Sequence, residues 1–289
     1  MNQDKKSILV TGSTGFFGSR ICAYFKDSYQ VIAPTHAELD ITDFESIKRL
    51  FENKRPDFLI HCVAISDVVE CGKDEDKSYA INVTGAENFA KMCALYGTKM
   101  IFCSSDQIYF EKKSDVRDRK IVPHKENDAV DPYNIYGRQK LEAEQKIMHY
   151  SKDAVCLRLS WMYDTKKLVE HEHSNFYLNV KANLEQGKVC SFPTHDVRGI
   201  TYVGDAVKNL QKVFLLPGGI YNYGAENKLS TFELLKALFA KKGIPEYAVE
   251  PNFQLFQENP RNISMDTSKL RSYGIEFAST LDGLVYNWK

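Results

Sequence analysis

The amino-acid sequence predicts a doubly wound α/β fold, in which helices cover both faces of a parallel β-sheet. Two observations carry this prediction. First, short apolar runs with β-like composition alternate with longer amphipathic stretches over more than half of the chain. Second, the stretch 74–95 has apolar residues at helical spacing. Short strands separated by helices of ten or more residues form right-handed βαβ units, and the strands of such units are parallel.

The expected strands are 7–10, 30–33, 58–62, 100–103 and 154–159, and the expected helices between them are 15–26, 44–53, 74–95 and 134–151. Pro132 precedes the last of these helices, and Asn134 is expected to cap it. The alternation weakens after residue 161, where we expect helices at 171–187, 203–215 and 229–242. Ser230 or Thr231 is the expected N-cap of the last helix, and Gly243 is its expected end.

Composition excludes several classes of partner. Lys and Arg together number 38, as do Asp and Glu, so no net charge attracts nucleic acid or an anionic membrane. No apolar stretch approaches the roughly 20 residues that span a bilayer, and the first six residues are polar. The seven cysteines lack C-x-x-C spacing and mostly lie in apolar runs, as reduced buried thiols do. We therefore expect a cytoplasmic protein without nucleic-acid or membrane partners.

A glycine-rich loop follows the first expected strand and opens the first expected helix. Its residues are Thr11, Gly12, Ser13, Thr14, Gly15, Phe16, Phe17 and Gly18, which form a G-x-x-G-x-x-G run. Gly12 suits a tight turn, Gly15 lets backbone approach a pyrophosphate, and Gly18 allows close packing of helix on strand. The free N–H groups of the helix N-terminus then face the anion. The loop predicts a Rossmann-type dinucleotide-binding sheet.

The residues after the second strand bear on which dinucleotide binds. NAD-binding folds usually place a carboxylate there for the ribose 2′-hydroxyl. This chain has Pro34, Thr35 and His36 instead, while Glu38 and Asp40 come later. The missing carboxylate leaves room for a 2′-phosphate beside His36. We expect NADP(H) to be preferred, with NAD(H) as the alternative.

Tyr136 and Lys140 are four residues apart, so they lie on one face of the helix expected at 134–151. A tyrosine has an ordinary pKa of about 10 and is a poor proton donor, but a nearby ammonium favours its phenolate. Ser105 follows the fourth strand, where a hydroxyl can hydrogen-bond a reacting carbonyl. Ser105, Tyr136 and Lys140 are therefore the expected catalytic residues of a carbonyl or alcohol oxidoreductase.

Together these motifs resemble the extended short-chain dehydrogenase/reductase family, and within it the dTDP-4-dehydrorhamnose reductase branch. The matching segments are 11–18, 39–43, 56–57, 61–64, 79–83, 104–106, 136–142 and 157–161, with 260–262 and 264–266 near the end. The resemblance implies that Asp40 and Ile41 lie by the adenine. It also implies that His61, Cys62, Val63 and Ala64 line the ribose and nicotinamide, with Asn82 supporting the lysine.

The resemblance further implies a nucleotide-sugar substrate, and Ser66, Asp106 and Trp161 are its expected contacts. The run around Arg198 departs from the branch and is similar to the R-x-x-x-Y-V-x-D run of sugar-nucleotide epimerases and dehydratases, in which the arginine meets the diphosphate. The expected activity is reduction of a 4-keto nucleotide-activated deoxysugar. An epimerase or dehydratase is an alternative.

A second alternative is a dinucleotide-binding regulatory subunit, since the beta subunit of methionine adenosyltransferase keeps similar motifs. We expect a dinucleotide-binding Rossmann domain at 1–162 and 200–224, and a smaller substrate-binding lobe at 163–199 and 225–289.

The sequence leaves the oligomeric state open, with a homodimer as one option. His171 and His173 point apart on a helix and have no evident further ligand, so no metal site is expected.

Overall fold

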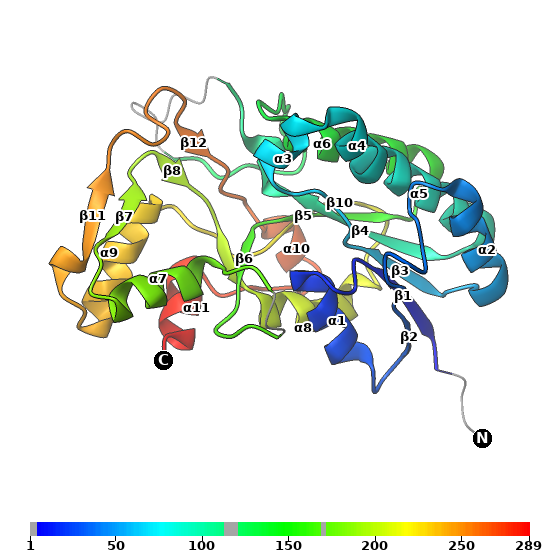
Figure 1. The fold of residues 1–289 in the computed structure, drawn as a ribbon, viewed down its shortest axis with the longest axis horizontal. Coiled ribbons are helices and arrows are strands. Elements are labelled where there is room, and N and C mark those ends of the chain that lie inside the picture. The colour runs from blue at the N-terminus through cyan, green and yellow to red at the C-terminus, as the bar shows by residue number, and fades with distance from the viewer. Residues whose placement is uncertain (1–4, 113–120, 169–171) are drawn as a thin grey trace. The chain divides into compact units, whose positions relative to one another are not determined.

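The computed structural model describes residues 5–112, 121–168 and 172–289, and Figure 1 traces the chain through them. Two compact units make up the chain. Unit 1 comprises Met1–Ser105, Asn134–Arg158 and Val207–Tyr221, and unit 2 comprises Asp106–Tyr133, Leu159–Ala206 and Asn222–Lys289. Backbone packing defines these units. The expected division into dinucleotide-binding and substrate-binding parts concerns ligands, and it stays a prediction.

A six-stranded sheet with the order β10-β5-β4-β3-β1-β2 forms the centre of unit 1 (Figure 1). Its strands are β1 (Ser7–Thr11), β2 (Gln30–Ile32), β3 (Phe58–His61), β4 (Lys99–Ser105), β5 (Val155–Leu159) and β10 (Gly219–Tyr223). Strands β2 and β3 both pair parallel to β1, and β4 pairs parallel to β3. The strand order therefore reverses between β1 and β3, and open α/β sheets bind ligands outside the strand ends at such a reversal.

Helices cover both faces of this sheet. They are α1 (Phe16–Phe25), α2 (Phe44–Lys54), α3 (Val68–Lys73), α4 (Glu75–Tyr79), α5 (Ala86–Tyr96), α6 (Ile135–Tyr150) and α8 (Val203–Val213), the last of which begins in unit 2. Phe51, Phe89 and Ile147 pack from α2, α5 and α6 into one core. On the other face, the rings of Phe25 and Phe214 lie 5.6 Å apart. The predicted fold class is confirmed.

Most predicted elements of unit 1 begin and end within two residues of their observed bounds. The predicted cap of α6 is confirmed, since the Asn134 side chain accepts a hydrogen bond from Gly137 N at 2.8 Å. One prediction needs correction. The helix expected at 74–95 consists of α4, a π-helical turn (Ala80–Gly85) and α5. A π-turn holds one extra residue per turn, so it re-aims the side chains that it carries.

Unit 2 contains short parallel strand pairs and helices. The pairs are β6 (Trp161–Tyr163) with β9 (Ile200–Tyr202), β7 (Cys190–Pro193) with β11 (Val249–Asn252), and β8 (Asp196–Val197) with β12 (Arg261–Asn262). The helices are α7 (Phe176–Glu185), α9 (Thr231–Lys242), α10 (Ser268–Arg271) and α11 (Thr280–Asn287), with 3-10 turns at Asp106–Tyr109 and Glu246–Ala248. Tyr163, Phe176, Leu235 and Leu284 from four of these elements meet in one buried core.

Two helices of unit 2 test the sequence predictions closely. Helix α9 begins at a capping box between Ser230 and Glu233 and ends at Gly243, as expected. Helix α7 was expected to begin at residue 171, which lies outside the described residues. The structure begins this helix only at Phe176. Asn175 caps it by accepting a hydrogen bond from Leu178 N. The local capping interaction therefore decides where this helix begins.

None of the helices within the described ranges is long and apolar enough to cross a membrane. Among the same residues, His, Cys, Asp and Glu side chains form no group of three or more that could hold a metal ion. Of the histidines at 171 and 173, where no metal site was expected, His171 lies outside the described residues. The Glu172 carboxylate beside it accepts a hydrogen bond from Leu168 N at 3.0 Å. Cellular location stays a prediction.

Candidate active site

The glycine loop turns sharply between β1 and α1. Gly12 has a φ of +69°, a conformation that strains residues with a side chain. A Cβ atom on Gly18 would come within 2.2 Å of the Gly12 oxygen, so only glycine fits there. A Cβ atom on Gly15 would meet that oxygen at 3.3 Å, with no other described neighbour recorded within 4 Å. The loop therefore closes tightly on Gly18 and leaves open space beside Gly15.

The first turn of α1 suits an anion. It contains no acidic residue, and Gly15 supplies no capping side chain. A helix N-terminus carries a partial positive charge on its free N–H groups. Thr14 is exposed at the tip of the loop, and Phe16 and Phe17 follow it into the helix. This cradle fits the pyrophosphate of a dinucleotide.

The chain after β3 forms a wall beside the glycine loop. A Cβ atom on Gly12 would lie 3.0 Å from Val63 N, so the backbone of Cys62 and Val63 passes directly behind the loop. Thr11 Oγ1 and His61 Nδ1 are 2.8 Å apart and join β1 to β3 at the last residue of each strand. Burial, and to a smaller extent the charge of Lys140, lower the pKa of His61 to about 3. This histidine is therefore neutral at physiological pH and serves as a link between strands.

The three expected catalytic residues all belong to unit 1. Ser105 ends β4, while Tyr136 and Lys140 lie in the first turns of α6. Lys140 Nζ donates a hydrogen bond of 2.7 Å to the carbonyl oxygen of Cys103, two residues before Ser105. The same nitrogen lies 4.5 Å from the ring centre of Phe102 and 5.7 Å from that of Tyr136. The structure thus brings the lysine, the tyrosine ring and the end of β4 together.

The Lys140 ammonium is almost entirely buried, with 1% of the residue exposed. Burial lowers its pKa to about 8, although neighbouring thiols and the Glu144 carboxylate act in the opposite direction. Glu144 itself forms a buried ion pair with Arg158 at 2.8 Å. At neutral pH Lys140 is mostly charged and sits in a low-dielectric surrounding. There its charge acts strongly on a nearby phenolate.

Asn82 lies in the π-helical turn, and its amide is fully engaged. Its Oδ1 accepts from Ile65 N at 2.9 Å, and its Nδ2 donates to Ile65 O at 3.0 Å and to Gln139 Oε1 at 2.8 Å. The resemblance implied that Asn82 supports Lys140. In the structure its direct contacts go to Gln139 of α6 and to the loop after β3, which leads to the exposed Ser66.

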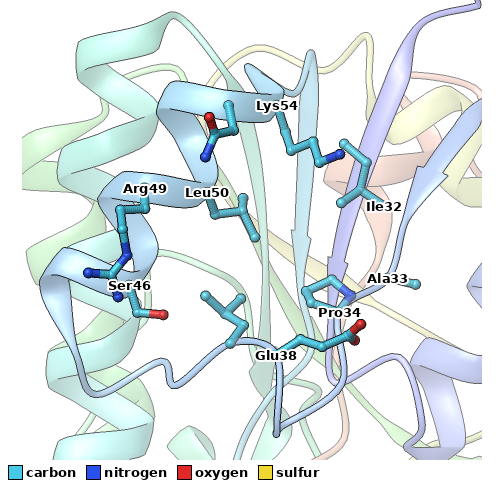
Figure 2. Close-up of a pocket in the computed structure, with 10 residues that line it drawn as sticks. Ile32, Ala33, Pro34, Glu38, Ser46, Arg49, Leu50 and Lys54 are labelled. Atoms are coloured by element: carbon cyan, nitrogen blue, oxygen red, sulfur yellow. The ribbon is translucent and has the colours of Figure 1, made fainter.

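The region after β2 lies beside a hollow of about 510 Å³ between that strand and α2 (Figure 2). Its lining includes Pro34 and Glu38 at one end and Lys54 at the other. The Glu38 carboxylate accepts hydrogen bonds from Thr35 N and Thr35 Oγ1, which lower its pKa. Asp40 is held in the same way by Thr42, and its pKa is lowered too. Both carboxylates thus stabilise turns, while His36 is exposed.

In unit 2, Arg198 lies at the centre of a polar and aromatic cluster. Its Nη2 is 3.1 Å from Asp106 Oδ2, and its guanidinium carbon lies 4.9 Å from the Trp161 ring centre. Trp161 in turn packs edge-on against Phe176, the first residue of α7, at 5.4 Å. Asp196, two residues before Arg198, pairs with Arg261 at 2.7 Å.

Two buried side-chain nitrogens of unit 2 have no hydrogen-bond partner among the described residues. They are Arg198 Nε and the Nδ2 of Asn175, the cap of α7. Buried donors are normally paired, so an unpaired guanidinium N–H and an unpaired amide at a helix N-terminus both suit an anionic or polar ligand. Sequence reasoning missed Asn175 because the expected helix ran through it. The Ser-Asn-Phe run that begins α7 was the available signal.

Comparison with known proteins identifies the family. A profile described as the RmlD substrate binding domain matches residues 6–281. The chain belongs to this family. The resemblance to the dTDP-4-dehydrorhamnose reductase branch is therefore confirmed.

Named relatives of this RmlD-family chain have different roles. It is 29% identical over 238 residues to the spore coat polysaccharide biosynthesis protein SpsK of Bacillus subtilis, covering 82% of this chain and 80% of SpsK. It is 26% identical over 297 residues to the methionine adenosyltransferase 2 subunit beta of Rattus norvegicus, covering 95% of this chain and 84% of that protein.

Solved structures agree on the fold of this RmlD-family chain. The dTDP-4-dehydrorhamnose reductase of Bacillus anthracis, in complex with NADP, superposes with a TM-score of 0.85 at 24% identity, covering 98% of this chain and 99% of that one. The UDP-glucose 4-epimerase of Thermotoga maritima, with UDP-glucose, gives 0.75 at 20% identity, covering 98% of each chain.

Proposed function

We propose that this protein is an NAD(P)H-dependent reductase of a 4-keto nucleotide-activated deoxysugar, with an activity like that of dTDP-4-dehydrorhamnose reductases. One observation carries the proposal. The buried ammonium of Lys140 lies 5.7 Å from the Tyr136 ring centre and is held on the strand that ends at Ser105. Burying a charge costs folding free energy, so a buried ammonium is rarely kept without a functional role. Ionisable groups with perturbed pKa values cluster at functional sites.

The cofactor is NADP(H) by preference, with NAD(H) as the alternative. Its pyrophosphate binds the cradle of Gly12, Gly15 and the α1 N-terminus. The exposed His36, with Glu38 held by Thr35, supports the preference for a 2′-phosphate. The related reductase of Bacillus anthracis was solved with NADP, and the related WbmG of Bordetella bronchiseptica with NAD.

The proposed reaction reduces a carbonyl group. The nicotinamide supplies the hydride when the cofactor is bound. Tyr136 donates a proton to the carbonyl oxygen, and the charge of Lys140 stabilises the resulting phenolate. Ser105 donates a hydrogen bond to the same oxygen and orients it. Lys140 also holds the nicotinamide ribose.

The proposed substrate contacts are Ser66, Asp106, Trp161 and Arg198. Arg198 binds the diphosphate, because its planar guanidinium is always charged and suits phosphate oxygens. The unpaired Arg198 Nε and Asn175 Nδ2 support this role. Trp161 provides an aromatic surface for the sugar, and Asp106 orients the arginine.

The test is oxidation of NADPH or NADH with a panel of dTDP-, GDP- and UDP-linked 4-keto sugars. We expect turnover with at least one of them. Tyr136→Phe removes one oxygen and keeps the ring, so turnover should fall by roughly 10²–10⁴-fold while dinucleotide affinity stays nearly unchanged. If the wild type binds dinucleotide but reduces no sugar, and Tyr136→Phe changes nothing measurable, the reductase proposal is wrong.

A second variant tests the substrate contacts. Arg198→Ala should weaken sugar-nucleotide binding by about tenfold or more, the loss of one charged hydrogen-bonding pair, and should leave dinucleotide affinity unchanged. Calorimetric titration with each ligand separates the two effects. An equal loss for both ligands would mean that the arginine only supports the fold through Asp106.

A regulatory subunit is the second candidate function. Its support is the similarity to methionine adenosyltransferase 2 subunit beta, which extends over 95% of the chain. A protein of this kind binds dinucleotide, turns over no sugar nucleotide and co-purifies with a catalytic partner. Stoichiometric NAD that resists dialysis would instead favour an epimerase or dehydratase.

A further inference from the structure

Three buried polar side chains connect helix α6 to the loop after β3. Gln139, Asn82 and Ser78 are 4%, 1% and 0% exposed. Gln139 Oε1 accepts from Asn82 Nδ2, and Gln139 Nε2 donates to Ser78 Oγ, both at 2.8 Å. The Ser78 hydroxyl in turn donates to the carbonyl oxygens of Cys71 and Glu75. Gln139 is thus the one member that comes from α6.

Asn82 transmits this connection to the backbone of Ile65. It binds both the N–H and the C=O of that residue, as a neighbouring strand would. Because Asn82 also donates to Gln139, its amide has a single orientation that satisfies all of its partners. Ile65 lies between Ala64, an expected dinucleotide contact, and Ser66, an expected substrate contact. Its position therefore sets the wall of the proposed site.

We infer that Gln139 is a positioning residue, whose amide holds Asn82 so that the loop 62–66 keeps its place beside α6. Gln139 lies three residues after Tyr136 and directly before Lys140, so the same helix carries the reacting groups and the anchor of the loop. The inference rests on the proposed function for the identity of its ligand, the dinucleotide. For its contacts it rests only on the buried network.

The expected effect of losing the anchor is on affinity. If Gln139→Leu leaves the loop in its binding conformation about a tenth of the time, the apparent dinucleotide Kd rises about tenfold. Because Tyr136 and Lys140 keep their own supports, KM for the dinucleotide should rise by a larger factor than kcat falls. The matched control is Gln145→Leu, the same change at an exposed position of α6.

Two measurements test the inference. Calorimetry gives the Kd for NADPH in wild type, Gln139→Leu, Asn82→Ala and the double variant. If Gln139 acts through Asn82, the double variant should bind no more weakly than Asn82→Ala alone. Hydrogen exchange at the Ile65 amide should be at least tenfold faster in Gln139→Leu than in Gln145→Leu, and this measurement needs no ligand.

Unchanged Kd and unchanged Ile65 exchange in Gln139→Leu would overturn the inference, as would equal effects in Gln145→Leu or additive losses in the double variant. A wild type that binds no dinucleotide would overturn the proposed function instead. In that case the exchange rate at Ile65 still decides whether Gln139 anchors the loop.

Discussion

Replacing Lys140 by methionine should make the protein more stable at neutral pH while removing its proposed activity. Methionine has a similar length and no charge, so it can occupy the buried path of the lysine side chain. Lys140 is 1% exposed, and burial lowers its pKa from 10.5 to about 8. The folded protein therefore holds this proton less tightly than the unfolded chain does, and folding is penalised wherever the unfolded lysine is charged.

The size of the effect follows from that pKa. The difference between 10.5 and about 8 corresponds to about 3 kcal/mol at neutral pH, since each tenfold change in proton affinity is worth about 1.4 kcal/mol. Losing the hydrogen bond to the Cys103 carbonyl opposes this by about 1–2 kcal/mol. The variant should therefore gain about 1–2 kcal/mol in its free energy of unfolding. For a chain of this size, that gain raises Tm by roughly 2–6 °C.

The lowered pKa of Lys140 also fixes how the stability difference between variant and wild type varies with pH. Between about pH 8 and pH 10.5 the unfolded chain binds more protons at this residue than the folded protein does, so this residue makes wild-type stability rise with pH. The variant lacks that contribution. Its advantage should be largest at or below pH 7, should shrink above pH 8, and should become a deficit near pH 10 because the lost hydrogen bond remains. Urea unfolding of both proteins at pH 7, 8.5 and 10 measures this difference.

A Lys140→Met protein that is less stable than wild type at pH 7, or a stability difference that does not vary with pH, would refute the reasoning. Either result would mean that the lysine is stabilised in place by contacts that outweigh its burial. The cofactor must be absent from these measurements, since a ligand that binds only the folded state would mask the effect.

Two further predictions concern the fold around the site. Gly18→Ala should lower the free energy of unfolding by about 1–3 kcal/mol, because its Cβ would lie 2.2 Å from the Gly12 oxygen. An unchanged urea midpoint would contradict this. Glu144→Ala should cost about 3–5 kcal/mol by leaving the Arg158 guanidinium buried without its carboxylate, whereas replacing both residues by methionine should cost far less. Equal losses in the single and double variants, measured by thermal unfolding, would contradict the second prediction.

The sequence by itself determined the features that depend on neighbours along the chain. The glycine loop was predictable because a tight turn with a φ of +69° at Gly12, followed at once by a helix, requires small residues at set intervals. The bounds of α9 were predictable because Ser230 and Gly243 act on the backbone within one turn of themselves. Tyr136 and Lys140 were placed on one helix face by their spacing alone.

Only the tertiary structure decided the features that depend on residues far apart in the chain. The lowered pKa of Lys140 arises from its burial over β4, and Arg198 is paired with Asp106, which is 92 residues away. The link from Gln139 through Asn82 to Ile65 joins three segments, and no local pattern marks it. Burial and hydrogen bonding between distant segments set the charge and orientation of these side chains, and neither quantity can be read from the spacing of residues along one segment.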